Sequence, residues 1–309
     1  MNNNKNAVVN GVIVPIITPV DQNENVDEVA FRAAIRRCLD AGVDGIFAGG
    51  SAGMGPLLSD DQWQRAMEIA SDEVDSDRVL LGGAISTSTR RAVEKIKVLE
   101  KTGFKHMAVT PSFYYTLKRD QEFLAHFDKC RQASSMDMVV YNIPSCTYSS
   151  IPLSVLEQMA SQGWFTTMKE SGGDRAYFKT AMEISLQYGF DLLQGNEPDI
   201  AWGLSCGAKG IIPVCANYEP QTFVAAWNAS KNGDNEMLEQ AQKRADYIRE
   251  ILLINSENWI AGIMYGVASL GIGSGIPVLP LEEVSESSKK QIDALNIINL
   301  CSGALNEHN

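Results

Sequence analysis

Hydrophobic residues of this chain gather in short runs, and longer segments with apolar residues at helical spacing separate the runs. Eight runs are nearly continuous in apolar and β-branched residues, as strands of a parallel sheet buried on both faces should be. They cover residues 12–17, 44–48, 78–82, 106–110, 137–141, 164–168, 190–194 and 210–214. This order predicts repeated strand–helix units.

The amphipathic segments between the runs predict helices near 27–41, 59–75, 87–102, 119–133, 152–161, 174–188 and 197–206. Ser59 and Gln62 have the spacing of a capping box, in which each side chain satisfies a free amide at a helix start. A glycine, which favours a left-handed helix terminus, ends several of these segments, at Gly42, Gly103, Gly189 and Gly207.

Eight such units predict a (β/α)8 barrel. A doubly wound sheet is the alternative, but it usually has fewer strands and a glycine-rich phosphate turn after the first one. Here the first run leads into Thr18-Pro19-Val20-Asp21, with no such turn.

Further helical segments follow the last run, near 219–231, 234–253, 257–270 and 285–300. We interpret the first as the eighth barrel helix and the others as an addition. The predicted organisation is a polar tail at 1–10, the barrel over 11–232, and a C-terminal helical extension over 233–309.

Composition and charge exclude several classes of protein. Of the 309 residues, 45% are hydrophobic and 21% charged, which is ordinary for a globular protein and unlike a disordered one. The formal net charge is −12, and the densest cationic pairs, Arg90-Arg91 and Lys289-Lys290, lie in helix-like segments. A duplex-binding protein needs a concentrated basic patch, so nucleic acid is not an expected partner.

Cysteine and histidine spacing predicts no metal site. The six cysteines at 38, 130, 146, 206, 215 and 301 form no C-x-x-C, and the histidines at 106, 126 and 308 form no zinc motif. The N-terminus is polar, without the apolar core of a signal peptide, and no run of 18 apolar residues predicts a membrane span. We therefore expect a cytoplasmic protein with reduced thiols and no membrane partner.

Candidate chemistry follows the predicted strands, because a barrel places its active site where the strands end. The glycine-rich stretch 49–55 follows the second strand and contains Ser51. Tyr141 ends the fifth strand, and Lys169 comes directly after the sixth. These residues are expected to face one mouth.

A lysine at the end of a buried strand loses solvation, which lowers its pKa and frees the amine for attack on a carbonyl. The resulting Schiff base is an electron sink for making or breaking a carbon–carbon bond. Tyr141 is placed to relay protons, and the amides after Gly50 suit a carboxylate or oxyanion. Taken singly, Lys169 can also be an ion-paired rim lysine, Tyr141 a strand-end tyrosine, and the glycine loop a tight turn.

These residues resemble a known family, the pyruvate-dependent class I aldolases typified by dihydrodipicolinate synthase and N-acetylneuraminate lyase. The similarity spans about residues 11–300. Gly50-Ser51-Ala52-Gly53 resembles the family's G-[ST]-T-G loop, Tyr141-Asn142-Ile143-Pro144 its Y-N-x-P motif, and Lys169-Glu170-Ser171 its lysine motif. The last two motifs lie 28 residues apart, counted from Tyr141 to Lys169, and are quite specific together.

The resemblance implies roles for individual residues. Lys169 would form the Schiff base with pyruvate or another 2-oxo acid, without a cofactor, and Tyr141 would relay protons. Ser51 would link Tyr141 to a tyrosine of the neighbouring subunit, either Tyr114 or Tyr115; alignment through His126-Phe127 favours Tyr115. The remaining implied residues would bind substrate and are Gly50, Ala52, Gly195, Asn196, Glu197 and Ile212.

The sequence also departs from the family pattern. Cys146 stands where the synthases carry an arginine for the aldehyde's carboxylate, which argues against efficient dihydrodipicolinate synthesis. Pro198 replaces one acid of the sialate lyases, and Val214 replaces a glycerol-binding serine. Ala52 replaces the second loop threonine, and Met54 the loop glutamate that follows.

We therefore expect a lysine-dependent aldolase or lyase that joins or separates pyruvate and a small aldehyde or sugar-derived acid. The alternatives are dihydrodipicolinate synthase with another basic group in place of the missing arginine, a 2-oxo acid dehydratase, and a non-catalytic pyruvate-binding protein. The resemblance also implies a homo-oligomer, usually a tetramer built from tight dimers.

Overall fold

The computed structural model describes residues 9–254 and 258–295. Some predicted features lie outside the described residues: positions 1–8 of the tail, position 257 of one predicted helix, positions 296–300 of the last helix, Cys301 and His308.

Eight parallel strands pair in chain order and close into a barrel, in which the first strand also pairs with the last. The closed order confirms the predicted (β/α)8 barrel and excludes the doubly wound alternative. The strands are β1 Gly11–Pro15, β2 Gly45–Ala48, β3 Val79–Gly83, β4 His106–Val109, β5 Asp137–Asn142, β6 Thr167–Glu170, β7 Asp191–Gln194 and β8 Gly210–Ile211.

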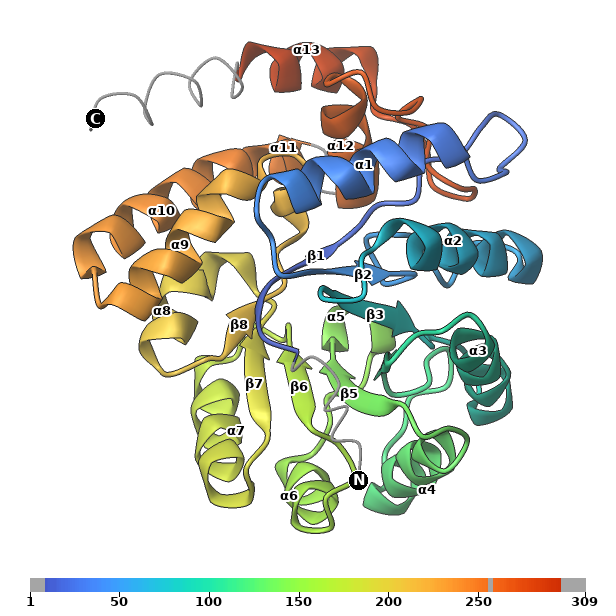
Figure 1. Cartoon of the computed structure of the whole chain (residues 1–309), viewed down its shortest axis with the longest axis vertical. Helices are drawn as coiled ribbons and strands as arrows, with labels where there is room; N and C mark the ends of the chain where they lie inside the picture. The colour runs from blue at the N-terminus through green and yellow to red at the C-terminus, as the bar shows by residue number, and fades with distance from the viewer. Residues whose placement is uncertain (1–8, 255–257, 296–309) are drawn as a thin grey trace.

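Helices surround the barrel (Figure 1), and the segments between strands fold as predicted. They are α1 Glu28–Asp40, α2 Asp60–Glu73, α3 Thr89–Lys101, α4 Asp120–Arg131, α6 Leu153–Ser161, α7 Arg175–Tyr188, α8 Ile200–Ser205 and α9 Pro220–Asn232. Three short elements shape the loops after the strands: α5 Pro144–Thr147, the 3-10 helix η1 Glu197–Asp199 and the 3-10 helix η2 Val214–Asn217.

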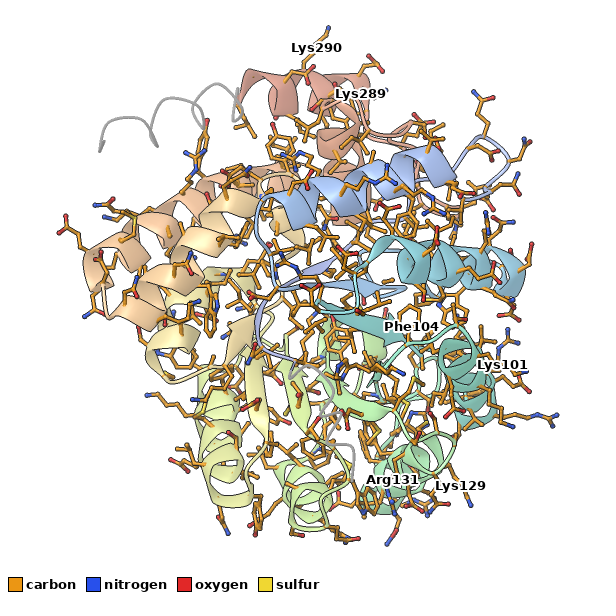
Figure 2. All side chains as sticks on the ribbon, viewed as in Figure 1. Lys101, Phe104, Lys129, Arg131, Lys289 and Lys290 are labelled. Carbon is orange, nitrogen blue, oxygen red and sulfur yellow. The ribbon has the colours of Figure 1, made fainter. Side chains whose placement is uncertain are left out.

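Four further helices follow the barrel: α10 Asn235–Ile248, α11 Glu250–Ile254, α12 Trp259–Ala268 and α13 Glu286–Ala294. Figure 1 shows them gathered on one side, with α10 beside α9 and α13 farthest from the strands. Lys289 and Lys290 lie on α13 at the surface, well away from Lys101, Lys129 and Arg131 on α3 and α4 (Figure 2).

Alternation along each strand divides the apolar residues into two cores. Met138 and Val140 of β5 belong to the large core between strands and helices. Val139 and Tyr141 of the same strand belong to a smaller core inside the barrel, together with Phe47 of β2. Side chains two residues apart on a strand point to the same face. Polar residues near the strand ends that lie on the same face as Val139 and Tyr141 therefore point into the barrel.

Several predicted boundaries are wrong. The sixth strand is Thr167–Glu170, not 164–168, so Lys169 lies within the strand. The segment before it is not extended, because Gly163 takes a left-handed turn with φ of 63° after α6 and the Phe165 ring packs 4.8 Å from that of Phe190. The eighth strand ends at Ile211, and Pro213, which has no N–H to donate, lies in the turn that follows.

Two predictions about helices also need correction. Ser59 precedes α2, but its side chain makes no capping hydrogen bond. Gln62 instead accepts the amide of Val26 at 2.8 Å, so it joins α2 to the chain before α1. The predicted helix 234–253 is interrupted at Arg249, which separates α10 from α11.

The glycine terminations are confirmed, because all four residues have positive φ values between 77° and 102°: Gly42, Gly103, Gly189 and Gly207. None of the described helices has the length and apolar character needed to cross a membrane.

Candidate active site

Lys169 places its amine inside the barrel, against two aromatic faces. On the sheet it is the register partner of Tyr141 on one side and of Leu193 on the other. Its Nζ lies 4.1 Å from the centre of the Tyr141 ring and 5.2 Å from that of Phe47. Only 4% of Lys169 is exposed, so the amine is withdrawn from bulk water.

This burial changes the acidity of the lysine. Loss of hydration disfavours the ammonium form and lowers the pKa of Lys169 to about 7, although Cys146 and Glu197 act in the opposite direction. A substantial fraction of the amine is therefore unprotonated near neutral pH, which is the form that attacks a carbonyl. The rim-lysine alternative does not describe this side chain, which is buried in the barrel rather than exposed at its rim.

Tyr141 presents its hydroxyl beside two serines. Burial raises the pKa of Tyr141, and the hydroxyls of Ser51 and Ser171 oppose part of that rise. The Ser171 hydroxyl is buried and acts on the Tyr141 hydroxyl. The three hydroxyls and the lysine amine thus form one polar group within apolar walls.

A cavity of about 330 Å³ opens onto these groups at the carboxyl ends of the strands. Its wall contains eight of the ten predicted site residues: Ser51, Ala52, Tyr141, Lys169, Gly195, Asn196, Glu197 and Ile212. The structure therefore brings together most of the residues that the sequence places on separate strands.

Gly50 is an exception, since it does not line the cavity. Its α-carbon packs against the Phe47 ring, so that an added Cβ would lie 2.9 Å from ring atoms. The loop turns back on itself at Gly55, whose carbonyl accepts from Lys95 Nζ at 3.3 Å. The loop thus presents Ser51 and Ala52 to the cavity, while Gly50 supports them from behind.

Tyr115 is the second exception, because within one chain it does not reach the cavity. Tyr114 and Tyr115 are each 79% exposed, and their rings contact each other edge to face at 5.1 Å. Tyr114 has a positive φ of 78°, which turns the chain outward after β4. Neither tyrosine lines the cavity of its own chain.

Glu197 is the carboxylate of the cavity. Its Oε1 accepts the Cys215 amide at 2.7 Å, and its Oε2 accepts from the Cys215 Sγ at 3.4 Å. Burial raises the pKa of Glu197. Those hydrogen bonds and the positive charges of Arg249 and Lys169 lower it, but by less. Asn196 beside it donates from Nδ2 to Asp199 at 2.7 Å, which fixes the orientation of its amide.

A second buried carboxylate supports the strand ends. Glu170 accepts from Asn142 Nδ2 at 2.8 Å and from the Gly172 amide at 2.5 Å, and burial raises its pKa to about 7. The Asn142 Oδ1 accepts the Ile151 amide at 3.0 Å. Asn142 therefore ties β5 to β6 and holds Tyr141 and Lys169 in register.

Four departures from the family pattern lie on the cavity wall: Ala52, Cys146, Pro198 and Val214. Met54 is different, because it is buried and its Sδ accepts the Val278 amide at 3.2 Å. Met54 thus contacts the segment before α13, whereas the other four residues line the cavity.

Sequence reasoning missed three polar residues of the wall, Ser145, Ser171 and Arg249. Ser171 was within reach of prediction, since it follows Lys169 and Glu170 in the lysine motif. Arg249 carries no local signal, because it interrupts a segment that reads as one continuous helix.

The described residues contain no group of three or more His, Cys, Asp and Glu side chains arranged to hold a metal ion. The five cysteines within the described ranges are free thiols.

Comparison with known proteins identifies the family of this chain. The model of the dihydrodipicolinate synthetase family matches residues 8–297. A 4-hydroxy-tetrahydrodipicolinate synthase of Methanopyrus kandleri is 29% identical over 285 residues, which cover 91% of this chain and 93% of the relative. An uncharacterised DapA-like lyase of Halobacterium salinarum is 26% identical over 286 residues, or 93% and 92% of the two chains.

Solved structures agree with this fold. A dihydrodipicolinate synthase crystal structure superposes with a TM-score of 0.87 at 25% identity, covering 95% of this chain and 99% of the other. YagE, a prophage protein of Escherichia coli K12 solved with pyruvate, has a TM-score of 0.88 at 20% identity, with 94% and 100% covered. The chain therefore belongs to the dihydrodipicolinate synthetase family, whose members are lyases.

Proposed function

We propose that the protein is a class I aldolase or lyase in which Lys169 forms an imine with pyruvate or a related 2-oxo acid. The observation that supports this most directly is the buried Lys169 amine, with a pKa of about 7, beside the Tyr141 ring in a cavity. An isolated lysine in water is almost fully protonated at neutral pH and is a poor nucleophile.

The proposed reaction begins when the neutral Lys169 amine attacks the C2 carbonyl of the 2-oxo acid. The carbinolamine loses water to give the imine, and loss of a proton from C3 gives an enamine. The enamine carbon attacks the aldehyde carbon, whose oxygen takes up a proton, and water then releases the product and the amine. The lyase direction reverses these steps.

Tyr141 is the proposed proton relay, with Ser51 as its hydroxyl partner. The backbone amides of Ser51 and Ala52 are proposed to hold the 2-oxo acid carboxylate, because donors fixed in a water-poor site stabilise an anion strongly. Both residues line the cavity, as does Ile212, which supplies an apolar wall.

Tyr115 is proposed to complete this relay from a second copy of the chain. Its ring is 79% exposed, although large aromatic side chains are usually well buried. Tyr114 is equally exposed and contacts it edge to face, so the two together offer an aromatic projection for a partner. On this proposal the active form is a homo-oligomer.

Borohydride trapping tests the proposed function. The protein is incubated with pyruvate, reduced, digested and mapped by mass spectrometry. We expect the reduced pyruvate adduct on Lys169 and not on Lys95, which is the other buried lysine of the described chain and has a pKa lowered to about 8. An unlabelled Lys169, or equal labelling of the Lys169→Ala variant, would contradict the mechanism.

The product separates the aldolase from a dehydratase. With pyruvate and an aldehyde panel, an aldolase yields a longer 2-oxo acid that retains its hydroxyl. A dehydratase instead removes water from a hydroxylated 2-oxo acid and releases no pyruvate.

A further inference from the structure

The cavity wall contains a second cation that the proposed imine chemistry does not use. Arg249 caps the end of α10, where the chain passes from Ile248 to Glu250 at the start of α11. Its side chain lines the same cavity as Lys169. These two are the basic residues of the wall within the part of the chain that the structure describes.

Arg249 lacks the partners that a partly buried arginine normally has. Its Nε is buried and has no hydrogen-bond acceptor, and its guanidinium makes no ion pair with any described residue. A buried donor without an acceptor is unfavourable, and a guanidinium offers five N–H groups in a rigid fork. Because Arg249 also lines the cavity, a ligand bound there can supply acceptors to its guanidinium.

The surroundings of Arg249 favour an anion as that ligand. Leu252, Leu253 and Trp259 line the cavity beside it, and such apolar walls strengthen charge interactions by excluding water. The acidic residue of the wall, Glu197, feels the charge of Arg249, but its two hydrogen bonds go to Cys215 and not to the arginine. The guanidinium fork is therefore open toward the cavity.

We propose that Arg249 binds a carboxylate carried by the aldehyde that reacts with the Lys169 imine. This inference rests on the proposed function and narrows its second substrate to acidic aldehydes. The planar fork of an arginine matches the two oxygens of a carboxylate, and a bidentate contact fixes the orientation of the molecule that carries it. The 2-oxo acid carboxylate is held elsewhere, at the amides of Ser51 and Ala52.

The test compares aldehydes that differ in one charged group. Succinic semialdehyde and butanal both have a four-carbon chain, but only the first carries a carboxylate. We expect the wild-type protein to prefer succinic semialdehyde. Arg249→Gln should lower kcat/KM for this aldehyde on the order of 10- to 100-fold, as loss of a charged hydrogen-bonded contact does, and leave butanal nearly unchanged. Arg249→Lys should recover part of the loss.

Binding provides a second readout that needs no turnover. The protein loaded with pyruvate is titrated calorimetrically with succinate and with its neutral amide, succinamide. We expect succinate to bind more tightly, and Arg249→Gln to remove the difference. Lys243→Gln is the matched control, because it removes the same charge from an exposed position on α10.

The outcomes separate this inference from the proposed function. Pyruvate trapping on Lys169 without any preference for the carboxylate overturns the role of Arg249 alone, as does an equal loss with both aldehydes in Arg249→Gln. A preference for glyceraldehyde 3-phosphate over glyceraldehyde that exceeds the carboxylate effect would assign the arginine to phosphate instead. Failure of pyruvate trapping overturns both.

Discussion

Tyr141 and Lys169 are register partners on β5 and β6, and the lysine Nζ lies 4.1 Å from the centre of the tyrosine ring. Because neighbouring strands hold the two side chains, their separation does not depend on a loop. A pair fixed in this way keeps an amine and a hydroxyl in the same cavity throughout the proposed reaction, which uses both.

Removing the Tyr141 hydroxyl should slow turnover while leaving imine formation possible. Tyr141→Phe keeps the ring that packs on Lys169 but removes the hydroxyl proposed as the proton relay, so we expect kcat to fall by about 10²-fold or more. Borohydride trapping of pyruvate should still label Lys169. Steady-state kinetics check this, and an unchanged kcat would show that another group moves the proton.

The rate of imine formation should rise with pH through about 7. Below that pH the Lys169 ammonium cannot attack a carbonyl, and above it the free amine predominates, because burial lowers the pKa to about 7. Stopped-flow measurement of pyruvate binding across this range gives the midpoint. A midpoint near the value of an ordinary lysine, about 10.4, would contradict the burial argument.

Burial of Lys169 should also lower the free energy of unfolding. Since the pKa of Lys169 is about 7 in the folded protein and about 10.4 in the unfolded chain, the unfolded state binds more protons between these values. The free energy of unfolding therefore rises with pH across this window, and the cost is greatest below pH 7.

Lys169→Met should remove that cost. We expect the free energy of unfolding at pH 6 to increase on the order of 3 kcal/mol, and the gain to shrink toward pH 10. Urea denaturation at both pH values measures it, with the exposed Lys243→Met as the control. Equal gains at both pH values would point to packing rather than charge.

Gly195 keeps space for the lysine at the end of β7. A Cβ at this position would clash with the Ser171 hydroxyl and lie 2.9 Å from Lys169 Cε. Gly195→Ala should therefore displace the amine and reduce pyruvate trapping at least about tenfold, because such sites tolerate little displacement. Far-ultraviolet circular dichroism of the variant should remain that of the wild type. Pyruvate trapping at the wild-type level would contradict the prediction, because the side chains would then have made room for the methyl group without displacing the amine.

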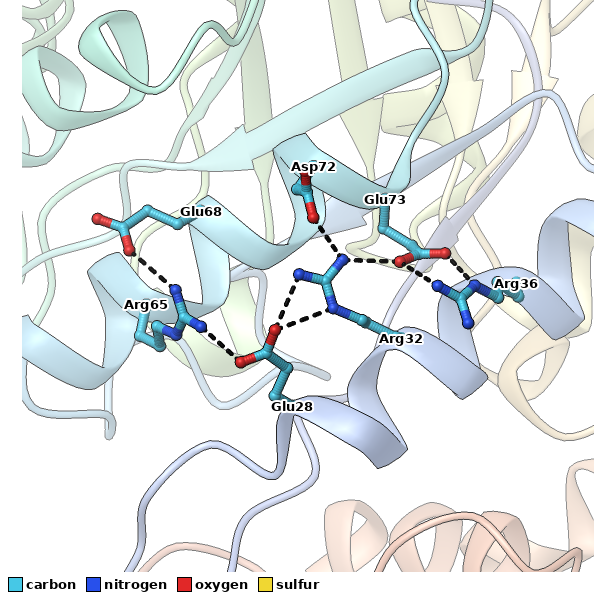
Figure 3. Close-up of polar contacts among 7 residues, drawn as sticks. All are labelled: Glu28, Arg32, Arg36, Arg65, Glu68, Asp72 and Glu73. Carbon is cyan, nitrogen blue, oxygen red and sulfur yellow. Dashed lines mark hydrogen bonds and ion pairs between the residues drawn. The ribbon is translucent and has the colours of Figure 1, made fainter.

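Glu73 links two helices through a surface network of charges (Figure 3). The Glu73 side chain is only 8% exposed, and its carboxylate contacts Arg32 and Arg36 of α1, while Arg32 also reaches Asp72 at 2.7 Å. Networks of this kind stabilise more than isolated exposed pairs. Glu73→Gln should lower the free energy of unfolding by about 1 kcal/mol, with kcat unchanged.

Glu94→Gln is the matched control for Glu73→Gln, because Glu94 pairs with Arg90 while both side chains are mostly exposed, at 60% and 90%. We expect almost no change in stability from it. Salt should reduce the Glu73 effect only partly, since that carboxylate is shielded from ions. Equal effects of the two variants would mean that burial of Glu73 contributes nothing.

Much of the architecture was predictable because the periodicity of apolar residues is local. Runs such as 106–110 and 137–141 have the composition of strands buried on both faces, and they match β4 and β5 closely. The site was partly predictable for a geometric reason. Parallel strands end at one mouth, so Tyr141 and Lys169 had to lie near each other once the barrel was inferred.

Strand boundaries were less predictable where tertiary packing overrides the local pattern of apolar residues. Trp164 and Phe165 are as apolar as any strand residue, but they pack outside the barrel, and the strand starts at Thr167. A shift of one residue reverses the direction of every side chain along a strand. The inward direction of Lys169 was therefore settled by pairing with Tyr141 and Leu193, not by its own neighbours in sequence.

The sequence by itself determined the strand–helix alternation, the barrel and the residue types at its mouth, because these depend on local periodicity and on strand order. Only the tertiary structure decided which of those residues share a cavity. It placed Gly50 behind the loop and Tyr115 on the surface, and it brought Arg249 from a C-terminal helix to the cavity wall, where no described residue accepts from its Nε. Contacts of this kind join residues far apart in the chain, and they arise only when packing sets the positions of the helices.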